Sequence, residues 1–322
     1  MASLLSVENL QVQFQTKKGI NTAVDGVSFS VEKGRILGIV GESGCGKSVT
    51  SMSILQLLGS NARISGGSIK LDGKELIGLP EKEMCRIRGN DIAMIFQDPM
   101  TALNPTLTIG TQLMEPIMLH QNCGKKEAWT RAVDVLKRVG TAAPEKRMKE
   151  YPHQLSGGMR QRVMIAMAVS CEPRLLIADE PTTALDVTIQ AQILELMCEL
   201  REKMGTAIML ITHDMGVVAE TADDVLVLYA GKAVEYGSIE DIFERPKHPY
   251  TQGLLNSIPR LDEDVELLNT IEGTVPAPDA MPAGCRFAPR CPYGKDRCMK
   301  EKPGVYHAGN SLVSCFRYEG EK

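Results

Sequence analysis

The stretch that decides the fold is Gly41-Glu-Ser-Gly-Cys-Gly-Lys-Ser48. It matches the pattern G-x-x-x-x-G-K-S without a gap and continues the apolar run of residues 35–41, which is typical of a strand buried on both faces of a parallel sheet. We expect a helix from Lys47 to about Leu58. A strand, a glycine-rich loop and a helix in this order predict that backbone N–H groups close on the β- and γ-phosphates of a nucleotide.

The loop also carries the side chains that phosphate chemistry requires. We expect Lys47 to neutralise charge on the phosphates and the Ser48 hydroxyl to bind Mg²⁺. Cys45 fills a position that the pattern leaves free, so we expect it to contribute only its backbone. The alternative is a glycine-rich turn with a surface lysine, and the flanking strand and helix argue against it. The predicted nucleotide contacts in this region are Gly41, Ser43, Gly44, Cys45, Gly46, Lys47, Ser48 and Val49.

Two carboxylates follow a second buried strand, predicted at residues 175–178. Asp179 and Glu180 should therefore emerge at the edge of the sheet where parallel α/β proteins bind their ligands. We expect Asp179 in the Mg²⁺ shell, which leaves Glu180 free to polarise the attacking water. The alternative is a pair of acids that merely cap a strand, and it is weaker because a phosphate loop accompanies them.

Strands that alternate with helices predict an α/β fold with a mainly parallel sheet. Residues 5–14 and 27–32 alternate apolar and polar side chains, which predicts a smaller antiparallel β subdomain around a looser segment, Thr16–Asn21. The continuous apolar runs that predict buried strands are residues 35–41, 92–96, 175–178, 207–211 and 225–229.

The rest of the chain departs from this alternation in two places. Residues 98–165, approximately, are expected to form a helical insertion, which includes an amphipathic helix around Trp129 and Leu136. Prolines become frequent after residue 240, which favours an irregular appended domain. We therefore predict a nucleotide-binding domain over residues 1–240 and a small C-terminal domain over residues 241–322.

Composition and charge exclude several classes of protein. The net charge is −4 and the isoelectric point about 5.8, so the chain has no basic footprint for nucleic acid. No apolar run approaches the roughly 18–20 residues that a membrane span requires. The first residues lack a basic region followed by an apolar stretch, so we expect no signal peptide and a chain that stays in the cytosol.

A second phosphate cradle is predicted at Ser156-Gly157-Gly158, just ahead of the acidic strand. Glycines that follow a serine at the start of a helix present backbone N–H groups and the positive end of the helix dipole to an anion. A chain with two such cradles either binds two anions or shares nucleotides with a partner.

Together these motifs resemble, in order and spacing, the ATP-binding cassette (ABC) ATPases over about residues 5–240. The resemblance implies a P-loop (RecA-like) fold and a head-to-tail dimer in which Ser156, Gly157 and Gly158 contact the γ-phosphate of ATP held by the other subunit. The segments that carry it are residues 41–48, Gln97, residues 155–162 and 175–180, Ala184-Leu185-Asp186 and His213.

The resemblance also implies roles for single polar residues. Gln97 would sense Mg²⁺ and couple to membrane subunits, and His213 would contact the γ-phosphate. Asp186 would lie at the dimer seam, and Gln161 belongs to the same trans set. Phe14 is the candidate for stacking on adenine, with a role in the core as the alternative. A lone histidine is usually structural and a lone glutamine usually solvated, but His213 and Gln97 both follow buried strands. The expected catalytic set is Glu180, His213, Gln97 and Lys47, and the expected Mg²⁺ set is Ser48, Gln97 and Asp179.

Residues 245–253 resemble the start of the C-terminal domain in the ATPases of oligopeptide and dipeptide importers, a resemblance that covers about residues 236–318. Four of the nine cysteines fall in this tail, and no two of them are spaced C-x-x-C, so a zinc ribbon is not the natural interpretation. A disulfide is disfavoured in the cytosol. Four thiolates in a proline-rich segment suit a [4Fe–4S] cluster, and the resemblance implies one at this spacing. Four thiols without metal remain the alternative, and zinc a weaker one. The cluster ligands would be Cys285, Cys291, Cys298 and Cys315.

The family resemblance implies an ATP-hydrolysing motor of a membrane importer for dipeptides or oligopeptides. Its partners would be a second ABC ATPase subunit, expected to be a paralogue, two transmembrane permease subunits and an extracytoplasmic substrate-binding protein, with no nucleic acid. The motor would lie at the cytoplasmic face of the cell membrane. Uptake of nickel chelates or glutathione by the same motor is the alternative, and a soluble ABC ATPase outside transport is less favoured. A P-loop kinase has no use for the Ser156-Gly157-Gly158 element.

Overall fold

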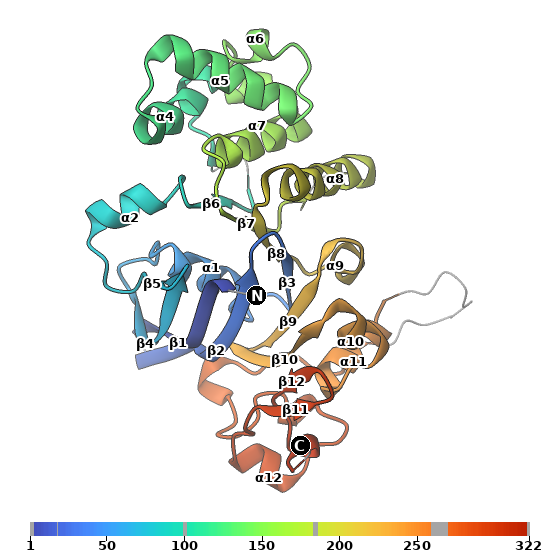
Figure 1. The fold of residues 1–322 in the computed structure, drawn as a ribbon. Helices are drawn as coiled ribbons and strands as arrows, with labels where there is room; N and C mark the ends of the chain where they lie inside the picture. The colour runs from blue at the N-terminus through green and yellow to red at the C-terminus, as the bar shows by residue number, and fades with distance from the viewer. Residues whose placement is uncertain (1–2, 18, 99–101, 183–185, 259–269, 321–322) are drawn as a thin grey trace. The chain divides into compact units, whose positions relative to one another are not determined.

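The computed structural model describes residues 3–17, 19–98, 102–182, 186–258 and 270–320 (Figure 1). Ala184 and Leu185, which the ABC resemblance includes, lie outside these residues. The chain forms two compact units. The first comprises Met1–Leu4, Glu32–Arg35 and Gly78–Ile211, and the second comprises Leu5–Val31, Ile36–Ile77 and Thr212–Lys322.

The first unit is built on three parallel strands, with β7 in the middle. These are β6 (Ile92–Ile95), β7 (Leu175–Asp179) and β8 (Ala207–Ile211). Every residue of β7 and β8 is buried, which explains why both are continuous apolar runs in the sequence. Parallel pairing places the carboxyl ends of β6 and β7 at the same edge, so the polar residues that follow the two strands come together there.

Helices make up most of the rest of the first unit. α4, α5 and α7 pack against one another, as Figure 1 shows. α5 buries a stripe of apolar side chains that includes Ala132 and Leu136, and it places Glu127 in its first turn and Arg138 in its last, where each complements the helix dipole. The helices of this unit are α2 (Glu81–Ile87), α4 (Ile109–Gln121), α5 (Lys125–Arg138), α6 (Pro144–Arg147), η1 (Pro152–Gln154), α7 (Gly157–Val169) and α8 (Val187–Met204).

The second unit contains a mixed sheet that leads into the phosphate loop. β3 (Ile36–Val40) pairs in parallel with β9 (Asp224–Tyr229), and β10 (Lys232–Ser238) lies antiparallel to β9. β12 (Ser311–Val313) pairs with β10, and β11 (Tyr306–Ala308) pairs with β12. The C-terminal tail therefore adds two strands to this sheet.

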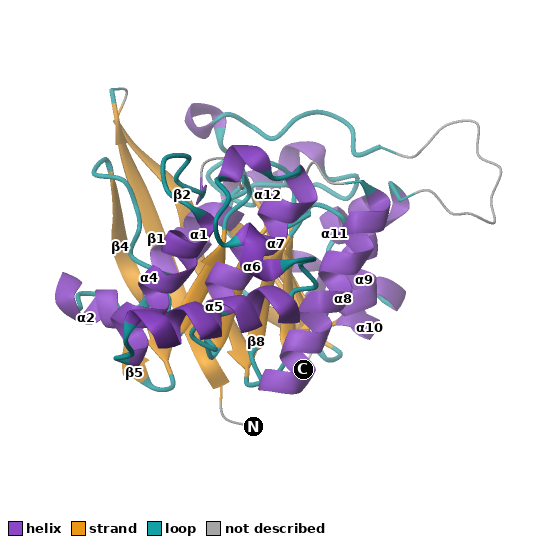
Figure 2. Ribbon diagram, turned by 90° about the horizontal axis from the view of Figure 1, so that it is seen from above, coloured by secondary structure: helices purple, strands orange, loops and turns teal. Residues whose placement is uncertain are grey.

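A second sheet in this unit is antiparallel, with the order β2-β1-β4-β5. β1 (Ser3–Thr16), β2 (Gly19–Glu32) and β4 (Ala62–Leu71) are long and lie side by side, as Figure 2 shows, and β5 (Lys74–Glu75) is a short edge strand. β1 and β2 confirm the predicted strands, and they leave much less loop between them than the looser segment expected at Thr16–Asn21. The sequence did not reveal β4, because glycines and polar residues interrupt its apolar pattern.

The helices of the second unit are short. α1 begins at Lys47, as predicted, but ends at Ile54, four residues before the predicted end at Leu58, because Gln56 adopts a left-handed conformation with φ of 50°. The remaining helices are α9 (Met215–Thr221), α10 (Ile239–Glu244), α11 (Pro249–Asn256), η2 (Pro278–Ala280), η3 (Ala288–Arg290), α12 (Asp296–Lys300) and η4 (Phe316–Tyr318).

The tail is attached to the sheet by a buried carboxylate and an aromatic cluster. Glu235 of β10 accepts hydrogen bonds from the backbone N–H groups of Lys247, at 2.7 Å, and His248, at 2.8 Å, just ahead of α11. Tyr250 of α11 and Phe287 pack edge-on against Tyr229 of β9, with ring centroids 4.6 and 5.1 Å away. These contacts replace the large core that a proline-rich segment cannot form. Among the described residues, no helix is both long and apolar enough to cross a membrane.

Candidate functional site

The backbone of the phosphate loop fits only glycine at its tightest points. A Cβ atom on Gly41, where φ is 150°, would lie 2.1 Å from the carbonyl oxygen of Leu228. Gly46 is the residue before α1, with φ of 100°. A side chain at either residue would push the loop away from β9 or force a strained conformation, so the glycine pattern here follows from local geometry.

Lys47 fills the inside of the loop. Its side chain is almost fully buried, and Nζ donates to the carbonyl oxygens of Gly41, at 2.6 Å, and Glu42, at 3.2 Å. Ser43, Gly44 and Ser48 are exposed, so the loop offers backbone N–H groups and a hydroxyl to solvent. An ammonium group held among carbonyl oxygens can exchange those contacts for phosphate oxygens.

Cys45 belongs to the loop but points inward. Its side chain is 1% exposed, and burial raises the pKa of its thiol. A thiol of this kind stays protonated at neutral pH and is a poor nucleophile. The position is therefore consistent with a residue that serves the loop through its backbone.

In the first unit, the structure brings Gln97 and Glu180 together. The Gln97 amide Nε2 donates to Glu180 Oε2 over 2.7 Å. Glu180 adopts φ of 48°, and its N–H donates to the carbonyl oxygen of Ile211 at 2.8 Å. A non-glycine residue in the left-handed region at the end of a buried strand is the kind of backbone strain that occurs at functional sites. Asp179, the last residue of β7, is 5% exposed.

The Ser156-Gly157-Gly158 element forms the N-terminus of α7, as predicted. Ser156 caps the helix by accepting a hydrogen bond from the N–H of Met159 at 3.4 Å, and Ser156 and Gly157 are exposed. Asp186 caps α8 in the same way, accepting from the N–H of Ile189 at 3.0 Å. A Cβ on Gly158 would lie 3.2 Å from the Ile189 side chain, so the N-termini of α7 and α8 are adjacent.

The starts of these two helices are exposed at Ser156, Gly157 and Asp186. Each helix keeps first-turn N–H groups that its single cap does not satisfy, together with the positive end of its dipole. Val187, next to Asp186, is 83% exposed. A partner that covers this surface would bury an apolar group and receive hydrogen-bond donors from two helices.

The surroundings of three other predicted residues do not test the roles expected for them. Gln161, expected in the trans set, is 2% exposed, and its amide donates to the carbonyl oxygen of Pro181, so its side chain is turned into the unit. His213 is exposed in the loop between Thr212 and α9. Phe14 is half-buried near the end of β1, where it faces Ala62 of β4 in the strand register. The predicted roles of all three remain predictions.

The four tail cysteines line one cavity of about 80 Å³, together with the side chains of Phe287, Phe316 and Arg317. Burial raises the pKa of the Cys285 thiol to about 11 and also raises the pKa values of Cys291 and Cys315. Within the described part of the chain, no three His, Cys, Asp or Glu residues lie close enough to hold a single metal ion. The thiols share a cavity, and the proposed cluster remains a prediction.

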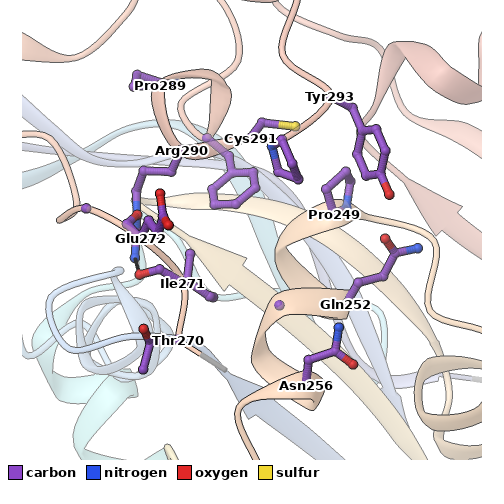
Figure 3. Close-up of a pocket in the computed structure, with 14 residues that line it drawn as sticks. Pro249, Gln252, Asn256, Thr270, Ile271, Glu272, Pro289, Arg290, Cys291 and Tyr293 are labelled. Carbon is purple, nitrogen blue, oxygen red and sulfur yellow. Dashed lines mark hydrogen bonds between the residues drawn. The ribbon is translucent and has the colours of Figure 1, made fainter. Parts of the chain in front are cut away.

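Residues that the sequence did not mark as functional connect the tail to the phosphate loop. The Glu42 N–H donates to Tyr250 Oη at 3.0 Å, and Arg290 Nη1 donates to the Glu42 carboxylate at 2.9 Å. Arg290 and Tyr250 are 248 and 208 positions from Glu42, so no local pattern in the sequence could indicate either contact. Arg290 also lines a cavity of about 630 Å³, shown in Figure 3, together with Gln252 and Asn256 of α11.

Comparisons with known proteins agree with this arrangement. A family model described as "ABC transporter" matches residues 24–183, and one described as "Oligopeptide/dipeptide transporter, C-terminal region" matches residues 234–298. The oligopeptide transport ATP-binding protein AppD of Bacillus subtilis (strain 168) is 56% identical to this chain, over 100% of this chain and 98% of the relative. OppD of Escherichia coli (strain K12), another oligopeptide transport ATP-binding protein, is 52% identical over 98% of this chain and 93% of its own length. The dipeptide transport ATP-binding protein DppD of Bacillus subtilis (strain 168) is 54% identical over 98% of this chain and 95% of its own length.

Solved structures give the same result for the nucleotide-binding part. The ATP-binding cassette MJ0796, in a dimeric post-hydrolysis state bound to ADP and Pi, is 27% identical with a TM-score of 0.66, covering 73% of this chain and 98% of its own. The cbiO1 cassette of Clostridium perfringens, part of the transporter complex cbiONQ, is 28% identical with a TM-score of 0.65. The match covers 76% of this chain and 92% of the cbiO1 chain. With its phosphate loop, its capped Ser156 element and its cysteine-bearing tail, the chain belongs to the oligopeptide and dipeptide transporter family of ABC ATPases.

Proposed function

We propose that this chain is the ATP-hydrolysing motor subunit of a membrane importer for oligopeptides or dipeptides. The observation that carries the proposal is the combination of an ATPase cassette with the C-terminal region of the oligopeptide/dipeptide transporter family, matched over residues 234–298. Relatives that share half or more of the sequence over nearly its full length are named as ATP-binding proteins of oligopeptide or dipeptide transport. Uptake of nickel chelates or of glutathione is the alternative cargo.

ATP binding is assigned to the phosphate loop. Lys47 leaves the carbonyl oxygens of Gly41 and Glu42 for the phosphates, and the loop N–H groups close on the same oxygens. Phe14 stacks on the adenine. Ser48, Asp179 and Gln97 offer the oxygen donors that Mg²⁺ prefers. The ion, when bound, neutralises charge that develops on the phosphates.

Hydrolysis is assigned to Glu180, the residue that Gln97 contacts in the structure. Its carboxylate accepts a proton from the attacking water and orients the water for in-line displacement at the γ-phosphate. The amide of Gln97 keeps the carboxylate in one orientation, which reduces the rearrangement needed before attack. His213 acts as a hydrogen-bond donor to the γ-phosphate.

The exposed starts of α7 and α8 are assigned to the partner cassette's nucleotide. Ser156, Gly157 and Gly158 donate to the γ-phosphate of ATP held by that cassette, and Asp186 lies at the seam between the two. Support comes from the exposure of Ser156, Gly157 and Asp186, and from that of Val187, which is 83% exposed. The side chain of Gln161 is buried, so only its backbone is available for such a contact.

The proposed assembly contains a second ABC ATPase subunit, a paralogue of this chain, two transmembrane permease subunits and an extracytoplasmic substrate-binding protein. The chain lies at the cytoplasmic face of the membrane. Residues 1–240 supply the motor, and residues 241–322 supply the family-specific tail. The helical segment of about residues 98–165 transmits closure of the two cassettes to the permease subunits.

A [4Fe–4S] cluster in the tail is a further part of the proposal. Cys285, Cys291, Cys298 and Cys315 line one cavity. A four-iron cluster takes one thiolate at each iron, so its ligands need not converge on a single ion. The cluster, when bound, would cross-link a segment whose helices are five residues or shorter. Protein purified without oxygen should be brown and contain about four irons per chain. Zinc, or no metal, would overturn this assignment.

Purification of the intact complex from membranes tests the proposal as a whole. Subunit identification should return two permease proteins and a second ATPase. ATP hydrolysis by the complex with its binding protein should rise on addition of peptides and not on addition of glutathione or nickel chelates. Stimulation by glutathione or nickel alone would transfer the assignment to that cargo.

A further inference from the structure

A buried arginine in the C-terminal tail contacts the phosphate loop and holds it. The Arg290 side chain is 6% exposed, and its Nη1 donates to both carboxylate oxygens of Glu42, at 2.9 and 3.1 Å. Glu42 is the second residue of the loop, and its carbonyl oxygen accepts a hydrogen bond from Lys47. One side of Glu42 therefore faces the phosphate-binding lysine and the other faces the tail.

Arg290 is itself fixed by several contacts. Its Nε donates to the carbonyl oxygen of Glu272 at 2.9 Å, and its Nη2 donates to the carbonyl oxygen of Ile271 at 3.2 Å. Figure 3 shows the side chain extended toward these two residues at the wall of the larger cavity. The guanidinium also lies 5.7 Å from the centre of the Tyr229 ring, and Nη1 donates to Tyr229 Oη at 3.3 Å. A guanidinium with this many fixed partners has one orientation, and it holds the Glu42 carboxylate in place.

Tyr250, also in the tail, contacts the backbone of Glu42. Its side chain is fully buried, and its hydroxyl accepts the N–H of Glu42 at 3.0 Å. Burial raises the pKa of Tyr250 far above its usual value, so the hydroxyl stays neutral at physiological pH. Glu42 is therefore held by the tail at both its backbone and its side chain.

A second arginine of the same tail segment reaches the other side of the loop. Arg286 donates to the carbonyl oxygen of Ala230 and lies 3.3 Å from the Asp25 carboxylate. Gly231, which follows Ala230, donates its N–H to the carbonyl oxygen of Cys45 in the loop at 2.8 Å. The segment between the first two tail cysteines thus contacts the surroundings of the loop at two separate points.

We propose that Arg290 is a positioning residue for ATP: it neutralises the Glu42 carboxylate, which would otherwise repel the triphosphate at the loop. The inference rests on the proposed ATP binding at this loop. Without Arg290, an unpaired negative charge stands beside the site that must receive a tetra-anionic nucleotide. The tail, which marks the family, then contributes directly to nucleotide affinity.

The test is a double-mutant cycle on the full-length chain, with ATP affinity measured by calorimetry and melting temperature recorded in parallel. Arg290→Met should weaken ATP binding by roughly tenfold, the size expected for a lost charged hydrogen bond. Glu42→Gln alone should change it little, and Arg290→Met with Glu42→Gln should restore most of the loss, because the unpaired charge is gone. Arg297→Met removes the same charge and breaks an exposed tail ion pair with Glu319, and it should bind ATP as the unmodified chain does.

The outcomes separate the possible failures. If the unmodified chain does not bind ATP, the proposed function itself fails. If it binds ATP but Arg290→Met binds equally well, or if Glu42→Gln does not rescue the loss, Arg290 has no positioning role. A lower melting temperature without rescue of affinity would show that Arg290 only supports the fold. In the assembled complex, the loss should appear in KM for ATP and leave kcat almost unchanged.

Discussion

Gln97 and Glu180, which follow neighbouring parallel strands, meet through a 2.7 Å hydrogen bond from the glutamine amide to the carboxylate. The contact joins two residues 83 positions apart. It follows from parallel pairing of β6 with β7, which brings the ends of both strands to one edge. A carboxylate held in one orientation by a neutral donor is suited to accept a proton from water.

The first prediction concerns that carboxylate. Glu180→Gln should bind ATP with normal affinity but hydrolyse it on the order of 10²–10⁴-fold more slowly, because the amide cannot accept the proton of the attacking water. Single-turnover hydrolysis and ATP binding, measured on the same preparation, check both parts. Glu172→Gln, which removes a carboxylate from an exposed ion pair with Arg138, is the control and should hydrolyse ATP normally. Near-normal turnover by Glu180→Gln would remove the role assigned to this residue.

The second prediction concerns the exposed start of α7. Ser156→Arg should leave ATP binding to the isolated chain unchanged, because Ser156 is expected to contact only a partner's nucleotide. Hydrolysis by the assembled pair of cassettes should fall, since the arginine blocks the surface where the partner docks. Lys47→Ala should instead lose binding in the isolated chain. Equal loss of binding in both variants would contradict a role across the interface.

The third prediction concerns the tight approach of the loop to β9. Gly41→Ala should lower stability by more than ~3 kcal/mol and abolish ATP binding, because its Cβ would lie 2.1 Å from the Leu228 carbonyl oxygen. Gly44→Ala is the matched control, since φ is 77° there and no atom lies within 4 Å of an added Cβ. It should cost only about 1 kcal/mol. Thermal unfolding of the two variants distinguishes steric exclusion from a general intolerance of side chains in the loop.

The fourth prediction concerns pH. Burial, with a smaller contribution from Arg317, lowers the pKa of His248 from 6.5 to about 3. Below pH 6.5 the unfolded chain takes up a proton that the folded chain does not, so the stability that His248 contributes is lost as the pH falls toward 3. The free energy of unfolding of the unmodified chain should therefore fall by about 1.4 kcal/mol per pH unit more than that of His248→Asn over this window. The free energy of unfolding is measured by urea titration at several pH values. If it depends on pH equally in the two proteins, the result would contradict a buried neutral imidazole.

Strong local patterns made much of this structure predictable. Runs of apolar residues marked β3, β7 and β8, because a strand buried on both faces has no polar positions. The phosphate loop and the Ser156 cap could be predicted because their chemistry lies within a few consecutive residues.

Contacts between distant parts of the chain could not be predicted. Arg290 is one arginine among many in the sequence, and only the fold brings it to Glu42. Gln161 lies in a motif, but its contact with the carbonyl oxygen of Pro181, 20 positions away, is not indicated by that motif. β4 escaped detection since its burial depends on pairing with β1 and not on an apolar pattern of its own.

Uptake of a labelled peptide is the sharpest measure of whether this chain powers a peptide importer. The complex that contains this chain should be reconstituted into vesicles with its binding protein, and the entry of a labelled peptide should be followed with ATP supplied on the side of the ATPase subunits. Uptake should require ATP, stop with Glu180→Gln in this chain, and not be competed by glutathione or a nickel chelate. Uptake that continues unchanged with Glu180→Gln, or ATP hydrolysis that never responds to any peptide, would contradict the proposal that this chain powers a peptide importer.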